Sequence, residues 1–258
     1  MTVFCLSVKL MYKYNPLECL PSSAELPDSD DTPVDNELQI LIPNLLLAIL
    51  AAIWQNRDDW FFGINMGVYY TPNKPAIVPD GFLSLSVERF VGENGRSSYV
   101  LWEEEGVPPI FTLEVVSQTY NGEYEQKKID YAQLGILYYA IYAPTRLRRK
   151  RQRLEVYHLV NGEYILQTGD KVWMPEIGLG IGRERGSYQG IMREWLFWYD
   201  EQGNRYLTPE EVKVEQQQQL VQSQQQLEQT QQELEQSQQQ LQELLIRLQQ
   251  KGIDPNTL

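Results

Sequence analysis

The sequence is poor in the residues on which several large classes of hydrolase depend. It has one histidine, His158, and two cysteines, Cys5 and Cys19, among 258 residues. His158 lies in an alternating stretch typical of a strand, so it is interpreted as a strand side chain rather than a catalytic base. Hydrolases with a histidine base, and those that bind metal through histidine, are therefore excluded. The cysteines lack metal-ligand spacing, which argues against a zinc site or a disulfide framework and for a reducing compartment.

The sequence also lacks an apolar run long enough to cross a bilayer. Its most apolar stretch, residues 38–54, is interrupted by Pro43 and Asn44. It falls short of the about 20 residues that a spanning helix needs. We expect a core helix here, with Asp35 as its N-cap. The first residues show no secretory signal pattern, so a cytoplasmic protein without a membrane partner is expected.

Positive charge is scarce. The chain has 22 Lys and Arg against 35 Asp and Glu, a formal net charge of −13. A protein that neutralises many phosphates normally presents a basic face, so tight non-specific binding of DNA is not expected from composition. The one concentrated basic segment is residues 146–153. Within it Arg148, Arg149, Lys150 and Arg151 either bind a DNA backbone or form a solvated loop, and both alternatives stay open.

Polar residues do occur inside apolar segments. Asp80 follows Pro79, and Glu114 lies in the strand-like sequence FTLEVV. An ionised carboxylate among such neighbours is costly unless it is paired or bound to metal. Lys127 and Tyr131 are four residues apart in a predicted helix, which places them on one helical face. Two acids and a backbone carbonyl suffice for Mg²⁺, which keeps several waters and binds substrate phosphate.

This pattern predicts a metal-dependent site for a phosphodiester. Mg²⁺, or Mn²⁺ in its place, would lower the pKa of a bound water and neutralise charge on the phosphate. The ammonium of Lys127 would orient that water or stabilise the pentavalent phosphorus. The alternative is a buried ion-pair network of Asp80, Glu114 and Lys127 with no metal.

These segments resemble the Uma-type restriction endonucleases, a family of the PD-(D/E)XK nuclease superfamily that is abundant in cyanobacteria. The resemblance runs roughly from residue 35 to residue 210. It is carried by Pro79-Asp80, residues 113–117, Lys127 with Tyr131-Ala132, and residues 135–139. It implies an α/β fold with a restriction-endonuclease-like core, a small mixed β-sheet flanked by helices, and Mg²⁺-dependent cleavage of DNA.

The resemblance also assigns roles to individual residues. Asp80 and Glu114 match the two metal-binding acids, and the carbonyl of Val115 matches the usual backbone ligand. Most members of the superfamily carry the catalytic lysine two residues after the second acid, where this chain has Val116. Lys127, on the following helix, fits the displaced position of the lysine in this family.

Four segments are predicted along the chain. They are an extended acidic lead at 1–34, the nuclease-like domain at 35–211, a Gln/Glu-rich heptad helix at 212–250 and a tail at 251–258. In the third, the residues at seven-residue spacing are Leu220, Leu227, Leu234, Leu241 and Leu248. The second seam position is polar in three heptads (Ser223, Thr230, Ser237) and becomes apolar at Leu244. A stable coiled coil needs both positions apolar, so a solvated helix is favoured over a homodimeric coiled coil, and a coiled-coil partner stays possible.

Local signals complete the predicted domain. Residues 60–70 and 76–87 are expected to form paired strands. The dipeptide Asn161-Gly162 predicts a hairpin between residues 154–160 and 163–167. The glycine-rich residues 177–182 are interpreted as irregular chain rather than a phosphate-binding loop. Three functions remain: an endonuclease acting on DNA, a catalytically silent nuclease fold that assembles through its helical tail, and a small-molecule phosphodiesterase.

Overall fold

The computed structural model describes residues 21–22, 36–116, 122–145 and 151–251. By internal contacts the chain divides into two compact units, Met1–Thr208 and Pro209–Leu258. Most of the predicted acidic lead, and all of the predicted tail except residue 251, lie outside the described residues.

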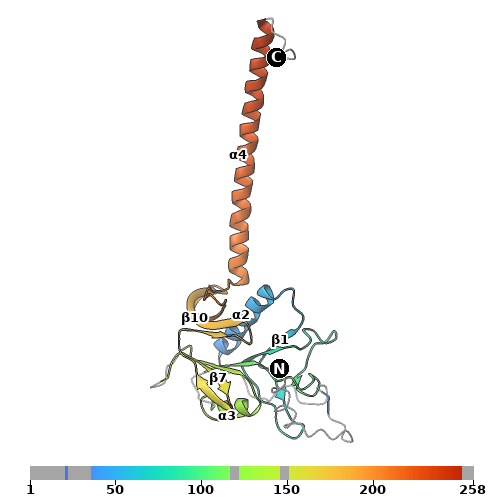
Figure 1. The fold of residues 1–258 in the computed structure, drawn as a ribbon, viewed down its shortest axis with the longest axis vertical. Coiled ribbons are helices and arrows are strands. Elements are labelled where there is room, and N and C mark those ends of the chain that lie inside the picture. The colour runs from blue at the N-terminus through green and yellow to red at the C-terminus, as the bar shows by residue number, and fades with distance from the viewer. Residues whose placement is uncertain (1–20, 23–35, 117–121, 146–150, 252–258) are drawn as a thin grey trace. The chain divides into compact units, whose positions relative to one another are not determined.

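A six-stranded mixed sheet is the centre of the first unit (Figure 1). Its strands, in spatial order, are β1 (Trp60–Ile64), β3 (Gly81–Leu85), β5 (Phe111–Val115), β6 (Tyr138–Tyr142), β7 (Leu154–Val160) and β8 (Glu163–Leu166). Only β5 and β6 are parallel, and every other neighbouring pair is antiparallel. Parallel neighbours need a crossover, which here contains helix α3 (Gln126–Gln133). The predicted α/β fold with a small mixed sheet is confirmed.

Helix α2 (Glu37–Ile53) confirms the predicted core helix, but its cap is Asn36 and not Asp35. The side chain of Asn36 accepts a hydrogen bond from the N–H of Leu38 at 3.0 Å. In return, the Gln39 side chain accepts from the N–H of Asn36 at 3.1 Å, which completes a capping box. Asn36 takes this role because it directly precedes the first helical residue.

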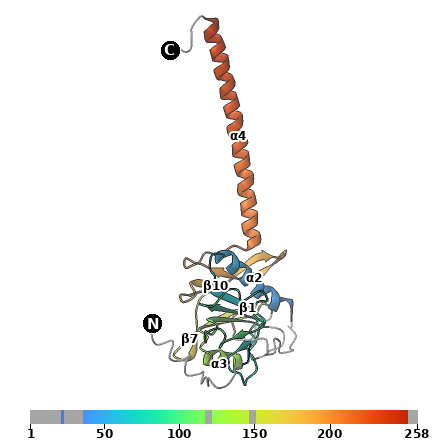
Figure 2. The same cartoon turned by 90° about the vertical axis from the view of Figure 1, so that its right-hand side faces the viewer.

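One face of the large sheet is covered by α2 and by a second, antiparallel sheet (Figure 2). The strands of that sheet are β9 (Lys171–Met174), β10 (Leu179–Tyr188) and β11 (Ile191–Tyr199). Trp198 of β11 is fully buried and donates its indole N–H to the carbonyl of Leu46 in α2 at 3.0 Å. Full burial of a large apolar side chain contributes about 1.5–3 kcal/mol, so this layer is a main source of stability.

The glycine-rich residues 177–182 are not irregular chain, and that prediction is wrong. Residues from Leu179 onward form the start of β10, paired with β9 and β11. A Cβ on Gly182 would lie 2.9 Å from the carbonyl oxygen of Asp170, from Cγ of Lys171 and from Cε2 of Tyr199. Close packing of neighbouring strands therefore requires this glycine.

The opposite face of the sheet carries α3. Along β5, Phe111, Leu113 and Val115 belong to the core under α2, so Thr112 and Glu114 face α3 because side chains alternate along a strand. A tyrosine-rich cluster that includes Tyr131 of α3 fills this side. A short parallel pair, β2 (Val68–Tyr69) and β4 (Tyr99–Val100), lies in the long connections that follow β1 and β3.

The hairpin predicted at Asn161-Gly162 is confirmed. Strands β7 and β8 pair in antiparallel register up to Val160 opposite Glu163. Asn161 and Gly162 have φ of 52° and 84°, the two positive values that a two-residue type I′ turn requires.

The second unit consists of one long helix, α4 (Pro209–Gln250). The helix expected from the heptad pattern is confirmed. Its first four seam leucines are exposed: Leu220, Leu227, Leu234 and Leu241. Among the described residues, no helix has both the length and the apolar character needed to cross a membrane.

Candidate active site

The structure brings Asp80, Glu114 and Lys127 together on the α3 side of the sheet. Asp80 directly precedes β3, and the register of Gly81 opposite Leu113 places it next to Glu114 of β5. Lys127 lies in the first turn of α3, and its Nζ is 2.8 Å from Oε2 of Glu114. Three residues distant in sequence therefore meet because β3 and β5 are neighbours and α3 crosses above them.

Asp80 is fixed by the backbone of β5. Its Oδ2 accepts a hydrogen bond from the N–H of Val115 at 2.6 Å, and the side chain is buried. Val115, whose carbonyl was predicted as a metal ligand, thus orients the first acid through its N–H. This hydrogen bond holds the carboxyl group of Asp80 in one orientation.

Glu114 is held on both carboxylate oxygens by two residues of α3. Oε2 pairs with Lys127, and Oε1 accepts from the hydroxyl of Tyr131 at 2.5 Å. The four-residue spacing of Lys127 and Tyr131 explains this arrangement, because both side chains project from one face of the helix. Tyr131 is fully buried and packs edge-on against Tyr139, with ring centroids 5.0 Å apart.

A third acid, Glu123, lies close to these groups and was missed by the sequence prediction. It is buried just ahead of α3, and the hydroxyl of Tyr139 donates to its backbone carbonyl at 2.7 Å. Its negative charge raises the pKa of both Asp80 and Glu114, which places it within electrostatic reach of each. Its neighbours in sequence are polar, so no apolar flank signalled a buried carboxylate.

The pKa shifts at the site reflect burial and an excess of acidic over basic groups. Burial raises the pKa of Asp80 to about 8, and the charge of Glu114 adds to the rise, while the Val115 N–H and Lys127 oppose it. The pKa of Glu114 is also raised, because burial outweighs its contacts with Lys127 and Tyr131. Burial alone would lower the pKa of Lys127, but the surrounding carboxylates bring it above its ordinary value. Near neutral pH Lys127 is therefore charged, and Asp80 retains a proton in the absence of a cation.

The two neighbouring carboxylates, Asp80 and Glu114, are ligands of the kind that Mg²⁺ takes from a protein. Among the residues that the structure describes, no group of three or more His, Cys, Asp or Glu has metal-binding geometry. Mg²⁺ is ordinarily held by one or two carboxylates, with waters and phosphate oxygens as its remaining ligands. A dication would also compensate the charge that now raises the pKa of Asp80.

Val116 occupies the position at which most of the superfamily carries the catalytic lysine. Its side chain is buried in the same cluster as Tyr131 and Tyr139, and its N–H donates to the carbonyl of Tyr142 at 2.8 Å. Val116 therefore packs in the core, and the ammonium that contacts Glu114 is that of Lys127 in α3.

Of the predicted basic clamp, Arg148, Arg149 and Lys150 lie outside the described residues. Arg151 is described, and it forms an ion pair with the buried Glu155 at 3.4 Å. Its guanidinium also lies over the ring of Tyr124, 4.3 Å from the centroid. The charge of Arg151 thus compensates a buried carboxylate.

The mixed sheet with its flanking helices is consistent with the restriction-endonuclease-like fold class. Residues 31–185 match the model of the Uma2 family, described as "Putative restriction endonuclease". The match covers more than half of the chain and includes Asp80, Glu114 and Lys127, so the chain belongs to this family. A comparison with curated proteins gave no match.

Proposed function

We propose that the protein is a Mg²⁺-dependent endonuclease that hydrolyses phosphodiester bonds of DNA, with Mn²⁺ able to replace Mg²⁺. One observation carries the proposal: a fully buried glutamate is fixed between a lysine and a tyrosine of one helix, beside a second acid whose pKa is raised. Perturbed acids gathered at one place are typical of catalytic sites. Family membership adds the nuclease class.

Each residue of the site has a distinct part in this proposal. Asp80, Glu114 and the carbonyl of Val115 would hold the cation, which when bound would activate water and neutralise phosphate charge. Asp80 must give up its proton for this, so binding is coupled to proton release. Lys127 would place its ammonium beside the attacking water and the phosphorus, and Tyr131 keeps Glu114 oriented.

Cleavage of supercoiled plasmid tests the proposal. The parent protein is expected to nick or linearise the plasmid with Mg²⁺ or Mn²⁺ and to be inactive with chelator. Asp80→Asn and Lys127→Met should each lower the rate by about 100-fold or more, the usual cost of removing one group that stabilises the transition state. Asp58→Asn is the matched control. Asp58 is exposed and precedes β1, which begins at the end of the sheet away from the candidate site.

Equal cleavage by the parent and by Asp80→Asn would contradict the assignment of this site. Cleavage of a small phosphodiester but not of DNA would instead favour the phosphodiesterase alternative. A cytoplasmic location is part of the proposal, since DNA is the substrate.

A second candidate function is assembly by a catalytically silent nuclease fold. It is favoured by the exposed leucines of α4, which offer an apolar seam to a second copy of the chain or to another helix. Val116 in place of the usual lysine also favours it. A folded parent protein that leaves plasmid intact with both metals, but self-associates only when α4 is present, would establish this alternative.

A further inference from the structure

A second group of charged residues lies at the end of the sheet where β5 and β6 finish, which is also the end that carries the candidate site. Val115 of β5 is opposite Tyr142 of β6, and the two strands are parallel, so both finish at this end of the sheet. Pro144 follows two residues after Tyr142.

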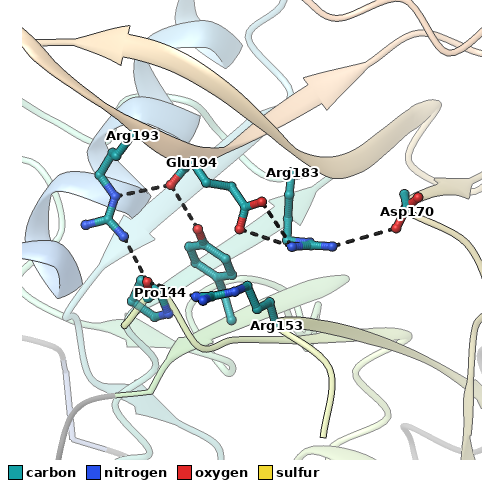
Figure 3. Close-up of polar contacts among 7 residues, drawn as sticks. Pro144, Arg153, Asp170, Arg183, Arg193 and Glu194 are labelled. Atoms are coloured by element: carbon teal, nitrogen blue, oxygen red, sulfur yellow. Dashed lines mark hydrogen bonds and ion pairs between the residues drawn. The ribbon is translucent and has the colours of Figure 1, made fainter. Parts of the chain in front are cut away.

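Two arginines converge on the carbonyl oxygen of Pro144 (Figure 3). Nη1 of Arg153, at the start of the β7 segment, donates to it at 3.3 Å. Nη2 of Arg193, in β11, donates to it at 3.2 Å. Nε of Arg193 also donates to the carbonyl of Glu194 at 3.1 Å, so this guanidinium is held in place by two backbone oxygens.

The neighbouring arginines differ in having acidic partners. Arg183 donates to both carboxylate oxygens of Glu194, at 3.0 and 3.1 Å, and lies 3.7 Å from Asp170 (Figure 3). The carboxylate of Glu194 is thus turned to Arg183. Neither Arg153 nor Arg193 forms an ion pair with any residue that the structure describes.

Two like charges that share a neutral acceptor are placed for an anion. A carbonyl supplies one oxygen and no charge, whereas each guanidinium has five N–H donors in a rigid fork. The contacts above use one of the donor nitrogens of Arg153 and two of Arg193. A phosphate oxygen pair is the ligand that matches the remaining fork geometry and compensates the charge.

We infer that Arg153 and Arg193 bind the phosphodiester backbone of DNA at the strand ends that also carry the candidate site, from the face of the sheet covered by α2 and β9–β11. This inference rests on the proposed nuclease function and names where that site contacts its substrate. The protein has a net charge of −13, which repels DNA as a whole. A local pair of cations can still attract the phosphates of the DNA backbone at this end of the sheet.

The test is DNA binding by the full chain in chelator, where no cleavage occurs. The probe is a short fluorescein-labelled duplex, and its anisotropy gives the affinity at several salt concentrations. Arg153→Gln and Arg193→Gln should each weaken binding and lower the slope of log affinity against log salt by about 0.9, and the double variant by about twice that. Arg153→Lys and Arg193→Lys keep the charge and should keep the slope.

Arg57→Gln is the matched control, because it removes the same charge far from the proposed contact. Arg57 forms an ion pair with Asp59 at 2.8 Å. It precedes β1, which begins at the other end of the sheet from the proposed contact. Its slope should equal that of the parent. Thermal melting verifies that each variant is folded, and either arginine alone suffices for the test if the other variant melts early.

The outcomes separate this inference from the proposed function. Slopes unchanged in both Gln variants would overturn the backbone contact, while plasmid cleavage by the parent would still support the nuclease. Plasmid left intact, together with altered slopes in the Gln variants, would overturn the nuclease function but support the contact of the two arginines with the DNA backbone. A parent protein that does not bind the duplex at all would overturn both.

Discussion

At the scale of single residues, the site depends on carboxylates placed where charge is expensive. Asp80 and Glu114 are both buried, and the cations available to them inside the protein are fewer than the acids. The sequence predicted Asp80, Glu114 and Lys127 because each stands out against apolar or helical neighbours. It did not predict Glu123, since a glutamate in a polar stretch has no pattern that distinguishes buried from exposed.

The pKa of Asp80 predicts how stability depends on pH without metal. Its pKa rises from 3.8 to about 8 on folding, so between these values the folded state binds more protons than the unfolded state. The free energy of unfolding should therefore fall as pH rises from about 4 to about 8, by an amount on the order of a few kcal/mol, and level off above. Urea denaturation in chelator across this range measures it.

Asp80→Asn provides the control for that measurement, because the amide resembles the protonated acid and does not titrate. Its stability should vary less with pH over the same interval. Added Mg²⁺ should restore stability to the parent at the alkaline end, where Asp80 is ionised. The same pH dependence in both proteins would contradict the raised pKa.

The hydroxyl of Tyr131 gives a second prediction at this scale. Tyr131→Phe removes the hydrogen bond to Oε1 of Glu114 without opening a large cavity. A hydrogen bond to a charged group contributes about 1.5–3 kcal/mol, so unfolding free energy should fall by about that amount and cleavage should slow. Tyr188→Phe is the control: it removes a tyrosine hydroxyl from β10, outside the candidate site, and should lower the free energy of unfolding less than Tyr131→Phe does.

At the scale of elements, the sequence predicted correctly those structures that neighbouring residues determine, and failed where distant strands determine the structure. The hairpin at Asn161-Gly162 was predicted because two residues determine the turn. The strand at 179–188 was not, because glycine is unfavourable in isolated strands and its place in β10 is dictated by β9 and β11. The cap of α2 was wrong by one residue, a difference that depends on the entry geometry of the helix.

Strand packing around Gly182 can be tested directly. Gly182→Ala places a methyl group 2.9 Å from the Asp170 carbonyl, a backbone atom that cannot turn aside. Overpacking of this kind typically costs about 1–3 kcal/mol, so the melting temperature should fall. At a temperature where the variant is folded, its plasmid cleavage should match the parent. Loss of cleavage in folded protein would instead indicate a functional role for the glycine stretch.

At the scale of the whole molecule, the chain combines a compact nuclease fold with one extended helix. The family match ends at residue 185, before β11 and α4. The sequence predicted the mixed sheet and the long helix, because buried acids in strands and seven-residue leucine spacing are different signals. It could not predict that Arg153 and Arg193, which lie 40 residues apart, both donate to the carbonyl of Pro144.

Truncation tests what α4 contributes. Its seam has leucine at one position and mostly serine or threonine at the other, which makes it a weak dimerisation surface. Analytical ultracentrifugation of the parent and of a chain ending at Glu211 should therefore give the same oligomeric state. Both should show the same melting temperature for the first unit. A dimeric parent with a monomeric truncated chain would show that α4 mediates self-association.

The crossover from β5 through α3 to β6 has a consequence for how such sites are recognised. The pleat of β5 puts positions 114 and 116 on the same side, and α3 runs over both, so an ammonium can enter one small volume from either the strand or the helix. This chain uses the helix and fills the strand position with Val116. A search for a lysine at the strand position alone would therefore overlook Lys127, which reaches Glu114 from the helix.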